Sequence, residues 1–209
     1  MTDERMAIVW DMGGVFNVYF TQVLADIGRA EGWPMDRIPL GPTGDIPDPD
    51  YLAMTNGELT EPEYTERLTN AMRAAGVTID IFTDVDWSQH DRPETWAFIE
   101  RASEAGIVQA ILTNDASRWM GEEWWQTWPR RWLFDAIVDV ATLGTRKPAP
   151  ETYLAACSAI DRRPDTCVFV DDMPVNCRGA EAVGMQAQLF DIVDPSASLA
   201  ELEERLGLS

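Results

Sequence analysis

The sequence predicts an α/β protein built on a Rossmann-like parallel sheet, with a small helical unit inserted after the first strand. Short apolar runs such as 7–10 and 167–170 alternate with stretches of helical periodicity along most of the chain. Runs that are apolar throughout are typical of strands buried on both faces of a parallel sheet. The 209 residues, 45% of them hydrophobic and 25% charged, suffice for one such core and an inserted unit.

The first expected strand, 7–10, ends at Asp11, and the pair Gly13-Gly14 then opens a loop. After Gly106, strands and helices alternate, which is typical of helices crossing over between parallel strands. We expect strands at 107–112, 136–140, 167–170 and 186–190, and helices at 151–160, 176–183 and 198–206.

The region between the first two strands is too long for a single crossover, and it contains helical patterns at 21–31 and 62–75. Thr60-Glu61-Pro62-Glu63 is a good helix start, with a capping threonine, an early proline and acids near the positive dipole end. A further helical stretch, 93–105, precedes the second strand. We therefore predict a core formed by residues 1–14 and 88–209 and a helical cap formed by residues 15–87.

Charge and composition exclude several classes of function. Sixteen basic residues against 36 acidic ones give a net charge of -20, which would repel nucleic acid and anionic membranes, so we expect neither as a partner. Residues 1–6 show no secretory signal, and the three cysteines show no tight pairing motif, so we expect a cytoplasmic protein with reduced thiols. The single histidine, His90, lies in a polar stretch, which argues against Ser-His-Asp catalysis.

Polar residues follow the expected strands at the points where the strands end. These residues are Asp11 after the first strand, Thr113 and Asn114 after the second, Lys147 in the loop after the third, and Asp171 and Asp172 after the fourth. Open parallel sheets bind their ligands at the carboxyl edge of the strands. We therefore expect a carboxylate, a hydroxyl, a lysine and an acidic pair to meet at that edge.

These motifs resemble those of the haloacid dehalogenase superfamily, which is dominated by phosphatases. Its first motif, a strand followed by Asp-x-Asp-Gly, is similar to Val9–Val15, and its Ser/Thr-Asn motif is similar to Thr113-Asn114. Its lysine motif is similar to Lys147-Pro148, and its acidic pair to Asp171-Asp172. The resemblance runs from Met6 to about Phe190. The segment 56–60 followed by a helix resembles the cap of the subfamily whose cap lies between the first and second motifs, and the overall pattern is similar to sugar-1-phosphatases and to the phosphatase domain joined to some epoxide hydrolases.

The resemblance implies a Mg²⁺-dependent hydrolase of a small phosphorylated metabolite. Asp11 would be the nucleophile and would form an aspartyl-phosphate that water then hydrolyses. Mg²⁺ would lie between Asp11, Asp172 and the backbone carbonyl of Gly13, with Asp171 behind them or as an alternative ligand.

The resemblance also implies which groups contact the phosphoryl oxygens. Lys147 would pair with Asp11 and with these oxygens, and Thr113 would donate its hydroxyl to one of them. The backbone amides of Met12, Gly13 and Asn114 are candidate donors to the remaining negative charge.

Gly13 departs from the family pattern, because it stands where the family has a second aspartate that protonates the leaving alcohol and activates water. General acid–base help is worth about 10²–10⁴ in rate. We therefore expect the site to favour leaving groups that need little protonation, such as anomeric sugar, aryl or acyl phosphates. Asp115 could supply the missing acid, although a loop-capping role is the simpler interpretation.

Two other functions remain open. The family's dehalogenases also lack the second aspartate and need no metal, but they usually carry no acidic pair, so Asp171-Asp172 favours the magnesium branch. A catalytically weak binding or regulatory protein with the same fold is the other alternative, and Gly13 keeps it open.

Two segments invite a ligand-binding interpretation. Five tryptophans lie between 119 and 132, at Trp119, Trp124, Trp125, Trp128 and Trp132. They could form a platform for a sugar or aryl group, but we favour a helix packed on the sheet with arginines stacked on indoles. Substrate choice should lie in the cap, with the segments 16–20 and 40–54 as pocket walls.

Overall fold

The computed structural model describes residues 6–81, 83–86, 89–114, 116–121, 123–140 and 144–208. The chain forms two compact units. One consists of residues 1–17 and 92–209, and the other of residues 18–91. We refer to them as the core unit and the inserted unit. None of the described helices has the length and apolarity needed to cross a bilayer.

The core unit contains a five-stranded parallel sheet in the order β3-β2-β1-β4-β5. The strands are β1 Ala7–Trp10, β2 Gln109–Thr113, β3 Ala136–Asp139, β4 Cys167–Asp171 and β5 Gln186–Leu189. Every residue of β1, β2 and β4 is buried, whereas the edge strands β3 and β5 are partly exposed. The parallel sheet confirms the predicted α/β class. Its central strands are buried on both faces, as expected for runs that are mostly apolar.

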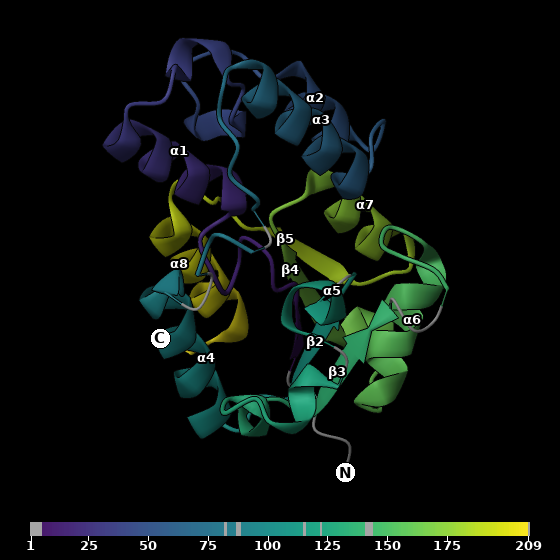
Figure 1. Ribbon diagram of the computed structural model, residues 1–209. Coiled ribbons are helices and arrows are strands. Elements are labelled where there is room, and N and C mark those ends of the chain that lie inside the picture. The colour runs from purple at the N-terminus through teal and green to yellow at the C-terminus, as the bar shows by residue number, and fades with distance from the viewer. Residues whose placement is uncertain are drawn as a thin grey trace. The chain divides into compact units, whose positions relative to one another are not determined.

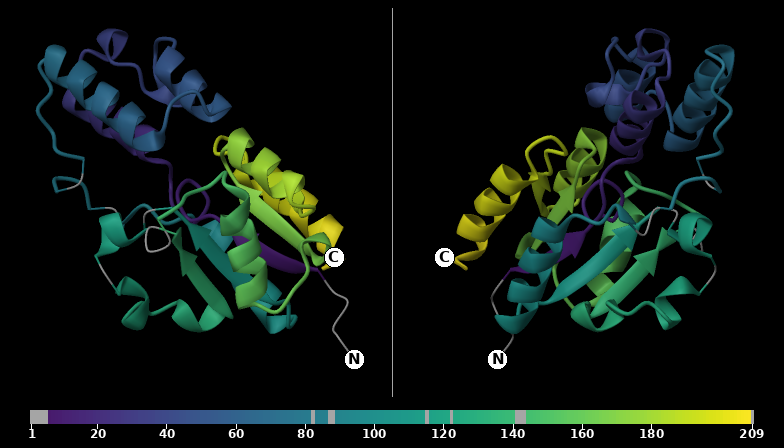
Figure 2. Two further views of the ribbon diagram at one scale, coloured as in Figure 1. Left: turned by 90° about the vertical axis from the view of Figure 1, so that its right-hand side faces the viewer. Right: turned by 60° about the vertical axis from the view of Figure 1, so that its left-hand side comes forward.

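Helices cover both faces of this sheet (Figures 1 and 2), with α4 and α8 on one face and α6 and α7 on the other. They span α4 Pro93–Glu104, α6 Pro150–Ala159, α7 Pro174–Ala182 and α8 Pro195–Leu206. Each begins at a proline, whose fixed φ suits the first helical position and whose missing N–H would have no partner there.

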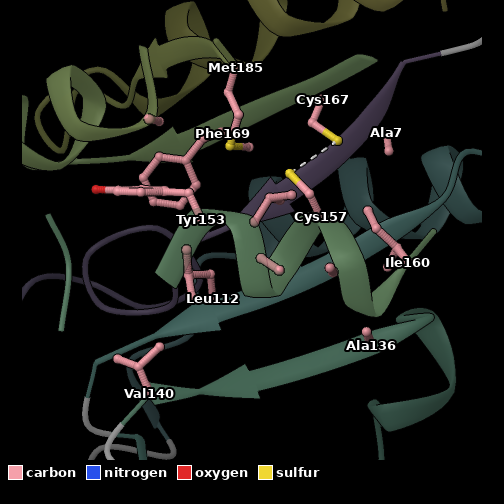
Figure 3. Packing of buried hydrophobic residues seen from close by; sticks show 14 residues of the cluster. Ala7, Leu112, Ala136, Val140, Tyr153, Cys157, Ile160, Cys167, Phe169 and Met185 are labelled. Atoms are coloured by element: carbon pink, nitrogen blue, oxygen red, sulfur yellow. Dashed lines mark hydrogen bonds between the residues drawn. The ribbon is translucent and has the colours of Figure 1, made fainter. Parts of the chain in front are cut away.

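Apolar side chains fill the space between α6, α7 and the sheet, as Figure 3 shows. Tyr153 of α6 and Phe169 of β4 meet edge to face, with their ring centroids 5.3 Å apart. The thiols of Cys157 and Cys167 lie in the same cluster with their sulfurs 3.8 Å apart. All three cysteines are free thiols and buried, so the prediction of reduced thiols agrees with the structure.

The other face is anchored by a buried hydrogen-bond network below the first strand. Trp10 Nε1 donates to Gln109 Oε1 at 3.0 Å, and Gln109 Nε2 donates to the carbonyl oxygen of Ile99 in α4 at 3.0 Å. Because these buried polar groups are hydrogen-bonded, they do not destabilise the fold as buried groups without partners would. The network therefore ties β1, β2 and α4 together.

The inserted unit is helical, with α1 Phe20–Glu31, α2 Pro49–Asn56 and α3 Glu61–Ala74. The predicted start of α3 is confirmed: Thr60 N and Thr60 Oγ1 both donate to the Glu63 carboxylate, and Thr60 Oγ1 accepts from Glu63 N–H. Helix α2 was not predicted from the sequence, because its proline and aspartates are also typical of a loop. In the structure Asp48 caps this helix by accepting from Tyr51 N–H at 2.9 Å.

The tryptophan-rich segment is not the single helix that we expected. It forms the short helix α5 Ala116–Met120 and two 3₁₀ turns, Trp124–Gln126 and Arg131–Leu133. Further 3₁₀ turns lie at Met35–Arg37, Gly41–Thr43 and Pro164–Thr166. The expected arginine stacking is present, but on a distant indole, since Arg130 lies 4.0 Å from the ring centroid of Trp96 in α4.

Phe16 was expected to line a substrate pocket, and this is wrong. It is 2% exposed and packs against Trp96 and Phe134, with ring centroids 4.9 and 5.6 Å away. Its backbone continues the turn that follows β1, because its N–H donates to the carbonyl oxygen of Met12 at 2.9 Å. Phe16 therefore holds this turn against the aromatic residues of the core unit.

One glycine of the core unit is required by close packing. A methyl group added at Gly179 of α7 would lie 2.6 Å from Tyr153 Oη, 2.8 Å from Pro148 Cβ and 2.9 Å from the Pro148 carbonyl oxygen. Tyr153 Oη already donates to the Asn176 carbonyl at 2.8 Å. The loop that carries Lys147 and Pro148 can approach α7 only because this position has no side chain.

We expect Gly179→Ala to lower the free energy of unfolding by about 1–3 kcal/mol, the usual cost of overpacking. Urea unfolding followed by circular dichroism measures it. Glu181→Ala, at an exposed position of the same helix, is the control and should change stability by less than about 0.5 kcal/mol. Equal stability of the two variants would contradict the assigned role of Gly179.

Candidate active site

The strand order creates a place for a ligand. The chain adds β2 and β3 on one side of β1, and β4 and β5 on the other, so its direction of travel reverses beside β1. In open α/β sheets, ligands bind at the carboxyl ends of strands at such a reversal. The register pairs Trp10 with Val170, so Asp11, just after the end of β1, lies beside Asp171, the last residue of β4.

Lys147 joins these two carboxylates. Its Nζ lies 2.6 Å from Asp11 Oδ1 and 2.9 Å from Asp171 Oδ2. The Lys147 side chain is 2% exposed, that of Asp11 13% and that of Asp171 0%. Burial lowers the pKa of Lys147, but the negative charges of Asp11 and Asp171 outweigh that effect and hold its pKa above the ordinary value. The ammonium is therefore firmly protonated.

Asp171 is held on both of its oxygens by protein donors. Besides Lys147, it accepts from Asn176 Nδ2 at 3.1 and 3.0 Å and from Met173 N–H at 2.8 Å. Asn176 lies in the first turn of α7, so the helix that follows β4 orients the carboxylate that ends β4. The geometry suits Asp171 to the positioning of Lys147.

Asp11, Asp171 and Asp172 form a group able to hold a cation. One oxygen from each lies within 4.8 Å of the others, and no other such acidic group occurs among the described residues. Burial raises the pKa of Asp11 to about 7, opposed by the charge of Lys147 and reinforced by that of Asp171. Three carboxylates beside one lysine leave excess negative charge, and oxygen ligands of this kind suit Mg²⁺. The donor set therefore fits a magnesium ion.

The other residues expected at the site lie along the same edge. Asn114 Oδ1 accepts from the backbone N–H of Lys147 at 2.8 Å, which fixes the start of the lysine loop. Thr113 ends β2 and is 3% exposed. Asp115 lies outside the described residues. Asp139 ends β3 and was not predicted to act near the site. It accepts a hydrogen bond from Ser117 N–H at 2.9 Å, so it orients the segment after Thr113.

Backbone hydrogen bonds close the turn after Asp11. Val15 N–H and Phe16 N–H both donate to the carbonyl oxygen of Met12, at 3.2 and 2.9 Å. Gly14 has φ +75°, a left-handed conformation that favours glycine. A Cβ at Gly13 would have no atom within 4 Å, apart from its chain neighbours, so the place of the family's second aspartate is open space.

Arg92 also contacts this turn, and nothing in its sequence context, Asp91-Arg92-Pro93, indicated such a role. It is 5% exposed, and its Nε donates to the carbonyl oxygen of Gly14 at 2.9 Å. A charged residue just before a helix-starting proline would usually be solvated.

Known proteins are similar to this chain in sequence and in fold. The chain is 24% identical over 214 residues to acyl-CoA dehydrogenase family member 10 of Mus musculus, a match that covers 96% of this chain and 19% of that protein. It is 31% identical over 85 residues to a fructose-1-phosphate phosphatase of Escherichia coli K12, covering 41% of this chain and 38% of that protein. The matches thus span well under half of either relative.

The crystal structure of a dehalogenase with an intermediate complex covers 98% of both chains, with a TM-score of 0.63 and 16% identity, and shows a shared fold. The model of the haloacid dehalogenase-like hydrolases matches residues 46–184, which is more than half of the chain. Together with the parallel sheet and the lysine-bridged carboxylates at its carboxyl edge, this match places the chain among the haloacid dehalogenase-like hydrolases.

Proposed function

We propose that this protein hydrolyses a small phosphorylated metabolite through an aspartyl-phosphate on Asp11, with Mg²⁺ held by Asp11, Asp172 and the carbonyl of Gly13. The observation that carries the proposal is the joining of Asp11 and Asp171 by Lys147, next to Asp172. A carboxylate can attack a phosphate only where positive charge offsets the repulsion between two anions. The similarity to a fructose-1-phosphate phosphatase over 85 residues supports the same class of substrate.

In the first step, an oxygen of Asp11 attacks phosphorus, and the bond from phosphorus to the leaving oxygen breaks. Lys147 orients Asp11 and shares its charge with the phosphoryl oxygens, while Thr113 Oγ1 and the amides of Met12, Gly13 and Asn114 donate to them. When bound, Mg²⁺ supplies positive charge that screens the attacking carboxylate from the phosphate.

In the second step, water attacks the phosphorus of the aspartyl-phosphate, which releases inorganic phosphate and restores the Asp11 carboxylate. Both steps move a proton, first to the leaving oxygen and then from the water. Gly13 has no side chain to assist either transfer. We therefore propose that the natural substrate has a leaving group of low pKa, such as an anomeric sugar, an aryl alcohol or a carboxylic acid.

We further propose that the inserted unit, residues 18–91, is the cap that selects the substrate. Its tyrosines form a cluster in which Tyr64 Oη donates to Asp48 at 2.8 Å, and Tyr51 and Tyr64 have ring centroids 6.0 Å apart. Because Tyr64 is 1% exposed, this cluster gives the inserted unit a packed interior of its own, and the unit can then present a fixed surface to a substrate.

A second candidate function follows from the glycine at position 13. Without an acid–base side chain, the site could bind phosphate and turn over so slowly that binding is its purpose. Beryllium fluoride mimics a phosphoryl group when it bonds to the nucleophilic carboxylate, so its capture tests whether Asp11 can accept that group. Phosphate release then separates hydrolysis from binding.

We expect Asp11→Asn to lower phosphate release from p-nitrophenyl phosphate by roughly 10³-fold or more, because the nucleophile is removed. The same change should abolish beryllium fluoride capture, detected by ¹⁹F NMR. Asp165→Asn, at an exposed ion pair with Arg163, is the control and should behave as the wild type. Capture without turnover in the wild type would favour the binding function over the hydrolase.

We expect removal of divalent cations by EDTA to stop phosphate release, and Mg²⁺ to restore it, because the acidic group then lacks a counterion. The same samples should release no chloride from 2-chloropropionate. Chloride release that persists in EDTA would instead support a metal-independent dehalogenase.

We expect Gly13→Asp to raise the rate by up to about 10²–10⁴ for alkyl phosphates with poor leaving groups, and little for aryl phosphates. The open space around Gly13 and its ordinary φ allow the substitution without strain. Rates across esters of rising leaving-group pKa provide the measurement. Gly13→Asn, of similar shape but unable to transfer a proton, is the control, and an equal gain in both variants would contradict the acid–base explanation.

A further inference from the structure

Arg92 is a buried cation whose role the proposed chemistry does not explain. Its side chain is 6% exposed, and the residue directly precedes α4, in the core unit. Burying a guanidinium is costly unless hydrogen bonds and negative charges compensate for lost water. Its contacts therefore show what the fold gains from placing a charge there.

The first set of contacts is with the turn after Asp11. Arg92 Nε donates to the carbonyl oxygen of Gly14 at 2.9 Å, and the backbone N–H of Arg92 donates to the carbonyl oxygen of Phe16 at 2.8 Å. One residue thus holds two carbonyl groups of the turn that contains Gly13. The planar guanidinium makes such a contact with less loss of rotamer freedom than a flexible ammonium would.

The second set of contacts is with the segment after β5 and with the charges nearby. Arg92 Nη2 donates to the carbonyl oxygen of Ile192 at 3.1 Å, and the guanidinium carbon lies 5.8 Å from the ring centroid of Phe190. Burial lowers the pKa of Arg92, while the negative charges of Glu94 and Asp172 oppose that shift. The Arg92 guanidinium therefore contacts the segment after β5 as well as the turn after Asp11.

The turn needs an external anchor because of its composition. Two successive glycines lose more conformational freedom on folding than any other pair of residues, and Gly13 has no side chain that packs. Yet this turn is where the proposed function requires a fixed carbonyl oxygen and fixed amides. Arg92 is the described side chain whose hydrogen bonds reach both this turn and the segment after β5.

We propose that Arg92 is a positioning residue of the site: it fixes the Gly13-Gly14 turn to the segment after β5, so that the Gly13 carbonyl oxygen and the turn's amides are held in place for cation and phosphoryl group. The inference rests on the proposed function for the identity of those ligands. It adds to that function a residue that touches neither of them.

Arg92→Lys tests the inference, since it keeps the charge but loses the planar guanidinium whose Nε and Nη2 donate to Gly14 and Ile192. Mn²⁺ serves as the probe, because electron paramagnetic resonance measures its binding without turnover. We expect Arg92→Lys to weaken Mn²⁺ binding by about 10- to 100-fold, the usual effect of losing a group that orients metal ligands. The kcat for p-nitrophenyl phosphate should fall by a similar factor, with KM changed less than about threefold.

Two controls separate positioning from stability. Arg101→Lys makes the same change within α4, at a partly exposed residue that pairs with Glu203, and should leave Mn²⁺ binding unchanged. Leu202→Ala removes a fully buried side chain of α8, so it should lower the melting temperature without weakening Mn²⁺ binding. Arg92→Gln, which is uncharged and shorter, is a second variant at the position and should match Arg92→Lys or exceed its loss.

The outcomes are distinct. Unchanged Mn²⁺ binding and kcat in Arg92→Lys, with an active wild type, overturn the inference and leave the proposed function standing. Weakened Mn²⁺ binding in Arg92→Lys but not in the two controls supports the inference, even if the wild type hydrolyses no phosphate ester and the proposed function fails. Failure of both Arg92 variants to fold would make the arginine a requirement of the fold and overturn its narrower role.

Discussion

The candidate active site depends on the ion pairs of one buried lysine. Lys147 reaches from the loop after β3 to the ends of β1 and β4, where it meets Asp11 at 2.6 Å and Asp171 at 2.9 Å. Removing one partner from a buried ion pair commonly costs about 3–5 kcal/mol, because a charge is left without compensation. Gly179 lets this loop approach α7, and Asn114 fixes its start. Packing, hydrogen bonding and charge thus converge on one ammonium group.

Much of this arrangement could be predicted from the sequence, because parallel strands impose it. Apolar runs identify the strands, and the carboxyl ends of parallel strands share one edge of the sheet. The sequence alone therefore predicts that Asp11, Thr113 and Asp171 lie together. The starts of α3 at Thr60 and of α4 at Pro93 could be predicted in the same way, but α7 and α8 begin at Pro174 and Pro195, before the expected starts at 176 and 198. The family motifs then singled out Lys147, whose loop has no periodic pattern of its own.

What could not be predicted depends on contacts between residues far apart in the chain. Arg92 lies 78 residues from Gly14, and no local pattern shows that its guanidinium is buried. Phe16 follows the site in sequence yet packs into the core unit, since aromatic neighbours from α4 and the 116–135 region surround it. Helix α2 was hidden because aspartate and proline favour both loops and helix starts. In each case tertiary packing decides between alternatives that local propensity leaves equal.

The acidic group has a consequence for the folded protein as a whole. Asp171 and Asp172 are neighbours in the chain, but only folding brings an oxygen of Asp11 within 4.8 Å of theirs. A cation that binds this group therefore binds the native state and not the denatured one. At a concentration 100 times its dissociation constant it adds about 2.7 kcal/mol to stability. The magnesium ion proposed for this site would thereby link the heat resistance of this hydrolase to the free concentration of that ion.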